Sequence, residues 1–299
     1  MSENFMKKAA KPMLFAAAFI WGSSFFIMKN ALDELPVQYL LALRFTMGAV
    51  LLGVLGWKKW RLFTPDYLWR GAVMGALLYL AYTVQTYGLA LTTPSKNAFL
   101  TSIYCVMVPF LYWLVARIRP DRYNVLAAAL CVVGIGLVSL EGDLTVNLGD
   151  ALTLACAIFY AAHIVAVAKL SQKRDIYLLT VFQFAFSALF AWTGGLALET
   201  FPAAALTRSE VLLPLLYLGV MATAVALLFQ NVGEAWSDPS SAAVILSLES
   251  VFGVLCSALF AGDEVSIRMG AGFVLIFVAV VCSETKFAFL RKKPAASPE

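Results

Sequence analysis

Ten apolar segments, each about as long as a membrane-spanning helix, follow one another along the chain with short polar breaks between them. A helix needs about 20 consecutive apolar residues to cross the hydrocarbon core of a bilayer. The pattern therefore predicts an all-α integral membrane protein with ten transmembrane helices. The predicted spans are residues 13–31, 36–56, 68–90, 95–116, 123–140, 149–168, 176–198, 211–232, 239–261 and 267–289.

The ten segments form two sets of five that resemble each other in sequence. The pattern Ala90-x-x-x-Pro94-Ser95-x-x-Ala98 recurs as Ala235-x-x-x-Pro239-Ser240-x-x-Ala243, which is 145 residues later. Each copy opens the fourth helix of its set, and its proline can occupy the first turn, where the missing N–H costs nothing. Thr93 and Asp238 are the predicted N-caps of these two helices.

Because five is an odd number, the second set of helices must enter the membrane from the opposite side. We therefore expect two inverted five-helix repeats, residues 1–145 and 146–290, followed by a disordered cytoplasmic tail at 291–299. Inverted repeats of this kind are typical of carriers whose site opens to each side of the membrane in turn.

The distribution of basic residues predicts the orientation of the chain. With the N-terminus placed in the cytoplasm, 17 of the 22 Lys and Arg residues fall on the inner side and four on the outer side, while Arg44 lies within a span. Cytoplasmic loops carry an excess of Lys and Arg, so both termini are expected in the cytoplasm. The protein itself is expected in the cytoplasmic membrane. The connection between spans eight and nine is expected to hold Glu234 and Asp238.

Composition supports a membrane protein and excludes several other classes. Hydrophobic residues make up 62% of the 299 residues and charged residues 13%, whereas a soluble domain carries about 25% charge. The positive residues lie at helix ends rather than in one patch, so no nucleic-acid partner is expected. All five cysteines fall inside predicted spans, which favours buried thiols over disulfides. No Cys/His cluster has metal-ligand spacing, and no cofactor is expected.

The first apolar run raises the question of a signal peptide. Lys7, Lys8 and Lys11 precede the apolar stretch 13–28, as in a secretory signal. The run is long, however, and no small-residue cleavage site follows it. We interpret it as the first helix, retained in the protein.

Polar groups at membrane depth are the most informative candidates for function, because they are costly there and commonly face a cavity. Glu249 lies near the middle of the ninth span, where it is expected to bind a cationic substrate group or a coupling proton, or to pair with Arg44 or a hydroxyl group. His163, the only histidine, is expected to titrate or bind substrate, or to form one interhelical hydrogen bond. For Arg44 we favour a structural role, through snorkelling or an ion pair.

Aromatic and amide side chains form a second group of candidates. They share helix faces and are expected to converge on a midplane cavity with aromatic walls and a few polar anchors, the usual design of a small-molecule site. This group contains Trp21, Phe25, Tyr79, Tyr82, Gln85, Asn97, Thr101, Tyr104 and Tyr160. Prolines are candidates for structure or gating: Pro94 and Pro239 at helix starts, and Pro109 and Pro214 as kinks within helices.

Short motifs along the whole chain resemble those of the drug/metabolite transporter superfamily, in particular its ten-helix EamA-type members. They are Ile20-Trp21-Gly22-Ser23-Ser24-Phe25, Leu43-Arg44-Phe45, Leu248-Glu249-Ser250-Val251 and Gly262-Asp263-Glu264. The chain departs from the family pattern at Ser250, where Pro is frequent, and at Arg119, where a Glu matching Glu264 is frequent. The resemblance implies transport and leaves the cargo open among amino acids, sugars, nucleotides, vitamins and toxic compounds.

The leading functional hypothesis is a secondary transporter that exports a small metabolite, such as an amino acid or a related compound, with proton coupling through Glu249 or His163. A lipophilic-cation efflux carrier is the alternative, and a channel or membrane scaffold is an alternative of another class. An enzyme is not expected, because the sequence lacks the His-Glu-x-x-His and Gly-x-Ser-x-Gly motifs. The expected partners are the lipid bilayer and a small-molecule substrate, and the protein is expected as a monomer or a homodimer.

Overall fold

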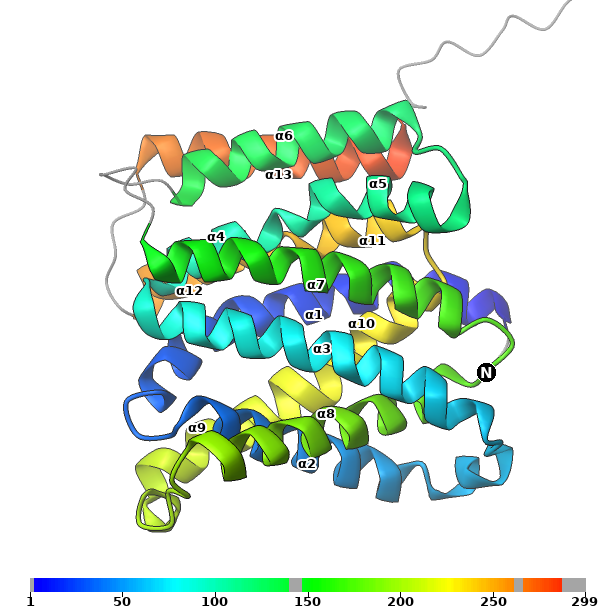
Figure 1. The fold of residues 1–299 in the computed structure, drawn as a ribbon. Helices are drawn as coiled ribbons and strands as arrows, with labels where there is room; N and C mark the ends of the chain where they lie inside the picture. The colour runs from blue at the N-terminus through cyan, green and yellow to red at the C-terminus, as the bar shows by residue number, and fades with distance from the viewer. Residues whose placement is uncertain (1–2, 140–146, 261–265, 287–299) are drawn as a thin grey trace, which may run out of the picture.

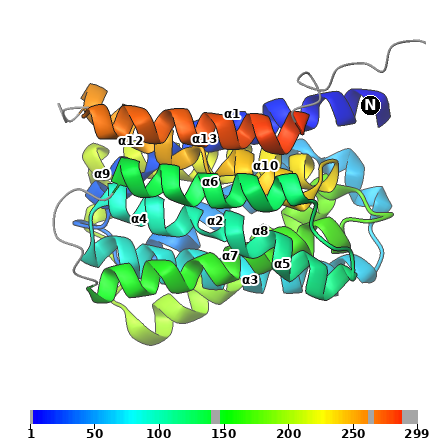
Figure 2. The ribbon, with the colours of Figure 1, turned by 90° about the horizontal axis from the view of Figure 1, so that it is seen from above.

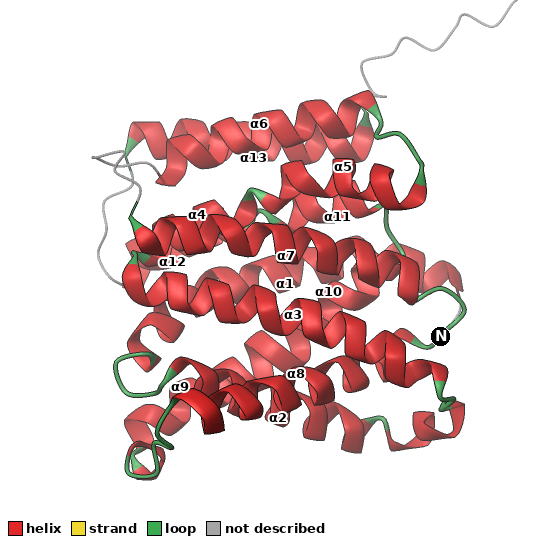
Figure 3. Ribbon diagram, in the orientation of Figure 1, coloured by secondary structure: helices red, strands yellow, loops and turns green. Residues whose placement is uncertain are grey.

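The computed structural model describes residues 3–139, 147–260 and 266–286, and the described part of the chain is helical with no β-strand (Figure 3). The predicted tail at 291–299 and the motif Gly262-Asp263-Glu264 lie outside the described residues. The α-helices are α1 (Glu3–Ala31), α2 (Val37–Leu55), α3 (Asp66–Leu91), α4 (Pro94–Ser102), α5 (Tyr104–Ala116), α6 (Arg122–Ser139), α7 (Leu148–Leu170), α8 (Ile176–Leu198), α9 (Ser209–Gly219), α10 (Ala226–Ala235), α11 (Pro239–Leu246), α12 (Glu249–Phe260) and α13 (Ile267–Thr285).

The long helices run side by side in one bundle (Figures 1 and 2). Along one lateral edge of the bundle α2 packs against α8, and along the opposite edge α6 packs against α13. Between them, α3 packs against α7 and α8, while α1 packs against α10 and α12. Segments of the first and second halves of the chain therefore alternate in space instead of forming two separate bundles.

Seven helical segments are long and apolar enough to cross a membrane by length and composition. They are residues 5–31, 37–55, 96–116, 148–170, 176–198, 209–235 and 239–256. Shorter apolar stretches lie in α6 and α13. The 26-residue α3 is not among the seven, since Tyr, Thr and Gln side chains lower the hydropathy of its second half.

The fourth helix of each half is broken, where the sequence predicted one continuous span. The first break falls at Ile103, between α4 and α5, and the second falls at 247–248, between α11 and α12. The N–H of Ile103 bonds to the carbonyl of Leu100, and the N–H of Leu248 bonds to that of Ile245. At both breaks the backbone therefore tightens into an i→i−3 turn. Ile103 and Leu248 are 145 residues apart, which is the spacing of the sequence repeat.

Serine hydroxyls accompany both breaks. Ser102 Oγ donates to the carbonyl of Ala98 at 2.9 Å, and Ser247 Oγ donates to that of Val244 at 2.7 Å. Such back-bonding competes with the helical ladder and bends it. Pro109, the predicted kink, lies instead inside α5, six residues after the first break.

A π-helical turn at Val220–Val225 joins α9 to α10. It begins six residues after Pro214, the other predicted kink. Wide turns of this kind disturb the backbone ladder and are frequent at functional sites. Here the carbonyl of Ala222 accepts a hydrogen bond from Trp21 Nε1 at 2.8 Å, so the turn is tied directly to α1.

The predicted helix starts are confirmed at both copies of the repeat. The Thr93 side chain accepts a hydrogen bond from the N–H of Lys96, and the Asp238 side chain accepts one from the N–H of Ser241. In both helices the proline occupies the first turn. The same side-chain chemistry therefore starts both helices.

Lysines at the ends of helices make defined contacts. Lys29 Nζ donates to the carbonyls of Leu89, Ala90 and Thr92, at 2.8, 3.0 and 3.1 Å. It therefore supplies hydrogen bonds to backbone carbonyls at the C-terminal end of α3. Lys96 Nζ lies 3.7 Å from a carboxylate oxygen of Asp150. These contacts join α1, α3, α4 and α7 at the end of the bundle opposite the N-terminus.

Candidate functional site

A small cavity lies in the middle of the bundle, where the broken helices of both halves meet α1, α2, α3, α7 and α10. Its volume is about 30 Å³, enough for about two water molecules. It is lined by Trp21, Ser24, Phe25, Met28, Arg44, Tyr82, Gln85, Thr101, Tyr104, Tyr160, Ile164, Gln230, Leu246 and Glu249.

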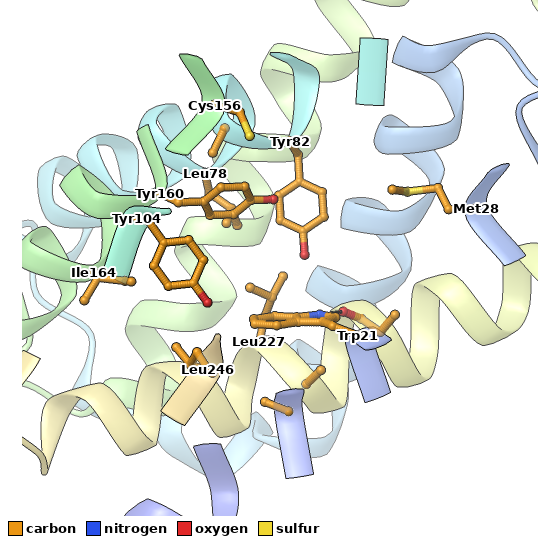
Figure 4. Packing of buried hydrophobic residues seen from close by; sticks show 14 of the residues in the cluster. Trp21, Met28, Leu78, Tyr82, Tyr104, Cys156, Tyr160, Ile164, Leu227 and Leu246 are labelled. Atoms are coloured by element: carbon orange, nitrogen blue, oxygen red, sulfur yellow. Dashed lines mark hydrogen bonds between the residues drawn. The ribbon is translucent and has the colours of Figure 1, made fainter. Parts of the chain in front are cut away.

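Aromatic rings form most of the cavity wall. The rings of Tyr82 and Tyr160 lie 5.6 Å apart, and those of Tyr104 and Tyr160 lie 6.2 Å apart, measured between centroids. Figure 4 shows these three rings on one side and the indole of Trp21 facing them. The sequence predicted an aromatic wall, and the structure brings these four side chains together.

Glu249 is the acidic residue of the cavity, and it is 4% exposed. It is the first residue of α12, just after the break, where the positive end of the helix dipole favours a carboxylate. Tyr104 Oη donates to Glu249 Oε1 at 3.4 Å. Ser102 Oγ, whose single proton is shared between the carbonyl of Ala98 and Glu249 Oε1, lies 3.3 Å from this carboxylate oxygen. Tyr104 occupies the position equivalent to Glu249 in the first repeat, so equivalent positions of the two halves meet here.

Arg44 is the basic residue of the cavity, and its structure corrects the expectation of snorkelling or an ion pair. The side chain is 1% exposed, so it does not reach the membrane surface. Its Nε donates to Thr223 Oγ1 at 3.1 Å, one of its terminal nitrogens contacts the sulfur of Met28, and its guanidinium lies 5.2 Å from the Tyr82 ring centroid. In the described part of the chain, no carboxylate pairs with it.

A hydrogen-bonded chain of neutral groups lies behind the aromatic wall. Tyr160 Oη donates to Gln85 Oε1 at 2.7 Å, and Gln85 Nε2 donates to Thr101 Oγ1 at 3.0 Å. Asn97 Nδ2 donates to the carbonyl of Gln85 and to Thr153 Oγ1. Asn97 is therefore part of the support of the cavity and does not line it.

Two further candidates lie away from the cavity. Tyr79 Oη on α3 donates to Gln38 Oε1 on α2 at 3.1 Å. His163 is completely buried, and its Nε2 lies 3.2 Å from Gln183 Oε1 on α8. For His163 the structure thus shows the interhelical hydrogen bond that was one of its two predicted interpretations.

Sequence reasoning did not single out Ser24, Met28, Ile164, Gln230 and Leu246 as cavity residues. Gln230 carried a usable signal, because it is an amide inside a predicted span, as Gln85 is. Glu234 was assigned to the connection after that span, but α10 continues to Ala235 and Glu234 is 1% exposed. That assignment was wrong because the predicted helix ended three residues too early.

Metal-ligand chemistry is not represented among the described residues. They contain no group of three or more His, Cys, Asp or Glu side chains that could hold a metal ion. The five cysteines are unbridged. What the cavity offers a ligand is therefore one cation, one carboxylate, two amides, hydroxyl groups and aromatic faces.

Comparisons with known proteins agree with this architecture. The model of the EamA-like transporter family matches residues 10–140 and 147–285, once in each half of the chain. An "Uncharacterized transporter" of Archaeoglobus fulgidus is 34% identical over 88% of this chain and 82% of its own length. The "Uncharacterized transporter YvbV" of Bacillus subtilis is 23% identical over 89% of this chain and 88% of its own. A solved structure described only as "Crystal structure of protein" has the same fold, with a TM-score of 0.78, 17% identity and coverage of 95% of this chain and 99% of its own.

Proposed function

Because the chain belongs to the EamA-like transporter family, we propose that it is a secondary carrier that exports a small metabolite, such as an amino acid, by alternating access. In this proposal α3, α6 and α13 cross the membrane together with the seven apolar segments, which gives ten crossings in two inverted repeats, residues 1–145 and 146–290. Both termini lie in the cytoplasm, and the protein resides in the cytoplasmic membrane.

The observation that carries the proposal is the pair of opposite charges in one cavity. Arg44 comes from the first half and Glu249 from the second, and neither forms an ion pair with a described residue. Burial of an unpaired charge is costly, so a ligand that carries both charges would relieve both groups. An α-amino acid has this chemistry: its carboxylate would bind Arg44, and its ammonium group would bind Glu249.

The small size of the cavity supports alternating access rather than an open pore. A volume of about 30 Å³ holds water but no amino acid, so a substrate requires the halves to move apart. The two helix breaks border the cavity, and the π-helical turn bonds to the lining residues Trp21 and Arg44. Both features supply positions where the backbone ladder is already interrupted. We propose that these positions bend when the two repeats rock around the site.

Counterflow is the direct test of the carrier function. Purified protein in liposomes loaded with an unlabelled amino-acid mixture is expected to take up labelled amino acids transiently against their gradient. A channel would instead pass voltage-driven currents far above the turnover of a carrier, and a scaffold would give neither signal. Uptake that never exceeds protein-free liposomes, for every amino acid tested, would contradict the carrier.

Proton coupling through Glu249 is the second part of the proposal. A carboxylate that faces the cavity can bind either a proton or the substrate ammonium group, so one would leave as the other arrives. Substitution Glu249→Gln is expected to change the pH profile of counterflow, because the competition between proton and substrate at this carboxylate is removed. If counterflow in this variant keeps the wild-type pH profile, the coupling role is excluded. His163, the other predicted coupling residue, is tested in the same way with His163→Gln.

Efflux of lipophilic cations is the second candidate function, and Glu249 with its aromatic surroundings favours it. Arg44 distinguishes the two candidates, since a buried cation in the same cavity opposes a purely cationic ligand. Cells that produce the protein are expected to survive amino-acid analogues better than control cells. Protection confined to cationic dyes would favour the efflux carrier.

A further inference from the structure

Helix α10 separates the central cavity from a second, larger hollow. Gln230 lines the cavity, whereas Phe229, Val232 and Trp236 on other faces of the same segment line a hollow of about 820 Å³. This second hollow is also lined by Met6 and Met13 of α1 and by the connection between α7 and α8. The helix segment between the two hollows contains Glu234.

Glu234 is a buried carboxylate joined to the cavity by one hydrogen bond. It lies one turn beyond Gln230 on α10, and Gln230 Nε2 donates to Glu234 Oε1 at 2.5 Å. The other carboxylate oxygen, Glu234 Oε2, and the other end of the amide, Gln230 Oε1, are both buried and have no hydrogen-bond partner among the described residues. Burying an ionised carboxylate with only one hydrogen-bond donor costs free energy, and uptake of a proton removes this cost.

The side chains packed around Glu234 are mostly neutral. Where α1 packs against this turn, Gly233 meets the apolar Ala10 and Leu14, and the basic residues of this part of α1 are Lys7, Lys8 and Lys11. The other face of α10 is joined through Asn231 to Gln183 of α8, which bonds to His163 of α7. The titratable side chains that share the cavity with Gln230 are Arg44, Tyr82, Tyr104, Tyr160 and Glu249, while Tyr177 is the one titratable side chain of α8 and α11 has none.

We propose that Glu234 is a proton-binding site and that its protonation state decides which end of the Gln230 amide is available to a ligand in the cavity. When Glu234 is ionised, Gln230 Nε2 is committed to its carboxylate. When a proton from water adds to the carboxylate, the new O–H donates to Gln230 Oε1 once the amide has rotated. Nε2 is then free to donate to an acceptor, such as a substrate carboxylate.

This site differs from the one at Glu249 in what can reach it. Glu249 lines the cavity, so a proton and the substrate compete for its carboxylate directly. Glu234 does not line the cavity and acts through Gln230. Its role in transport rests on the proposed carrier function, but proton binding at Glu234 does not. The two ideas can therefore fail separately.

Infrared spectroscopy of the full chain in nanodiscs tests proton binding without any substrate. During a pH titration, we expect the carbonyl band of a protonated, buried carboxyl group that is lost in Glu234→Gln and kept in Glu210→Gln, the same change at an exposed glutamate of α9. Glu234→Asp, which retains a carboxyl group, should keep a band with a shifted midpoint. Gln230→Met should shift the frequency of the band, because it removes the amide partner.

The same variants in the counterflow assay, with labelled amino acids as the probe, test the link to transport. The amide introduced by Glu234→Gln can donate to Gln230 Oε1 as a protonated carboxyl would. This variant is therefore expected to lose the part of the pH response that passes through Gln230, whereas Glu210→Gln keeps the wild-type pH profile.

Three results would count against parts of this account. A carboxyl spectrum of folded Glu234→Gln protein that loses no band relative to wild type overturns the proton site. Loss of the band with an unchanged pH response of counterflow overturns the switch through Gln230. Absence of counterflow in every variant, wild type included, contradicts the carrier function and leaves the infrared result standing.

Discussion

Arg44 and Glu249 are the two charged residues that line the cavity, and neither forms an ion pair with a described residue. Arg44 presents a planar guanidinium held by Thr223 and stacked over Tyr82. Glu249 keeps one oxygen bonded to two hydroxyl groups. Together with the tyrosine rings, they line the cavity that we propose as the binding site for a substrate with both charges.

Substitution of Arg44 tests recognition of the substrate carboxylate. Arg44→Gln is expected to raise the half-saturating amino-acid concentration in counterflow about 10- to 100-fold, because a hydrogen bond to a charged group contributes about 1.5–3 kcal/mol. Arg44→Lys should be impaired as well, since the lysine lacks the planar fork. The control is Arg208→Gln, an exposed arginine paired with Glu34. Equal half-saturation in Arg44→Gln and the control would remove Arg44 from the binding site.

At this scale the sequence predicted residue types better than their contacts. Trp21, Tyr82 and Glu249 could be chosen because a polar or aromatic group inside an apolar span needs a partner or a cavity. The positions of Asn97 and His163 could not be chosen, since the direction of a side chain depends on how neighbouring helices rotate. Glu234 was missed because nothing in the local pattern marks where a helix stops inside a polar stretch.

Interruptions and close contacts of helices are the features that decide the shape of the cavity. The breaks at Ile103 and Leu248 place Tyr104 and Glu249 at helix starts that face each other. Apolar periodicity cannot reveal such breaks, because both halves of a broken helix remain apolar. The Pro-Ser helix starts were predictable, since capping chemistry is local.

Glycines in α3 allow its close approach to α8, because small residues spaced as in Gly71-x-x-x-Gly75 let two helices come close together. A Cβ atom on Gly75 would lie 2.7 Å from the carbonyl of Gln183 and 2.8 Å from Phe186 Cβ. Gly270 of α13 differs, since no atom of the described residues lies within 4 Å of the corresponding position.

These two glycines make a matched pair for a stability experiment. Gly75→Ala is expected to destabilise the protein by about 1–3 kcal/mol, the usual cost of overpacking. Gly270→Ala should leave stability unchanged or raise it slightly, because a helical alanine is favoured over glycine. Apparent Tm values in detergent measure both. A Gly75→Ala variant as stable as wild type would show that α3 and α8 are packed less closely than described here.

The whole molecule is a bundle in which the two halves of the chain are interleaved around one site. The family model matches each half once, and a solved structure with only 17% identity shares the fold over nearly the whole chain. The repeat and the membrane class were predictable from the five-plus-five pattern. The pairing of helices across the halves was not, because it depends on contacts between segments far apart in the sequence.

The central claim is that the cavity opens to the two sides of the membrane in turn, and the accessibility of Ser24 tests it most directly. Ser24 lines the cavity and tolerates a change to cysteine in size. In proteoliposomes of known orientation, a membrane-impermeant thiol reagent is applied from either side to Ser24→Cys in a background whose five free cysteines are replaced by serine, with that background alone as the unlabelled control. The account predicts labelling from each side separately; labelling that is confined to one side, whatever amino acid is present, would contradict it.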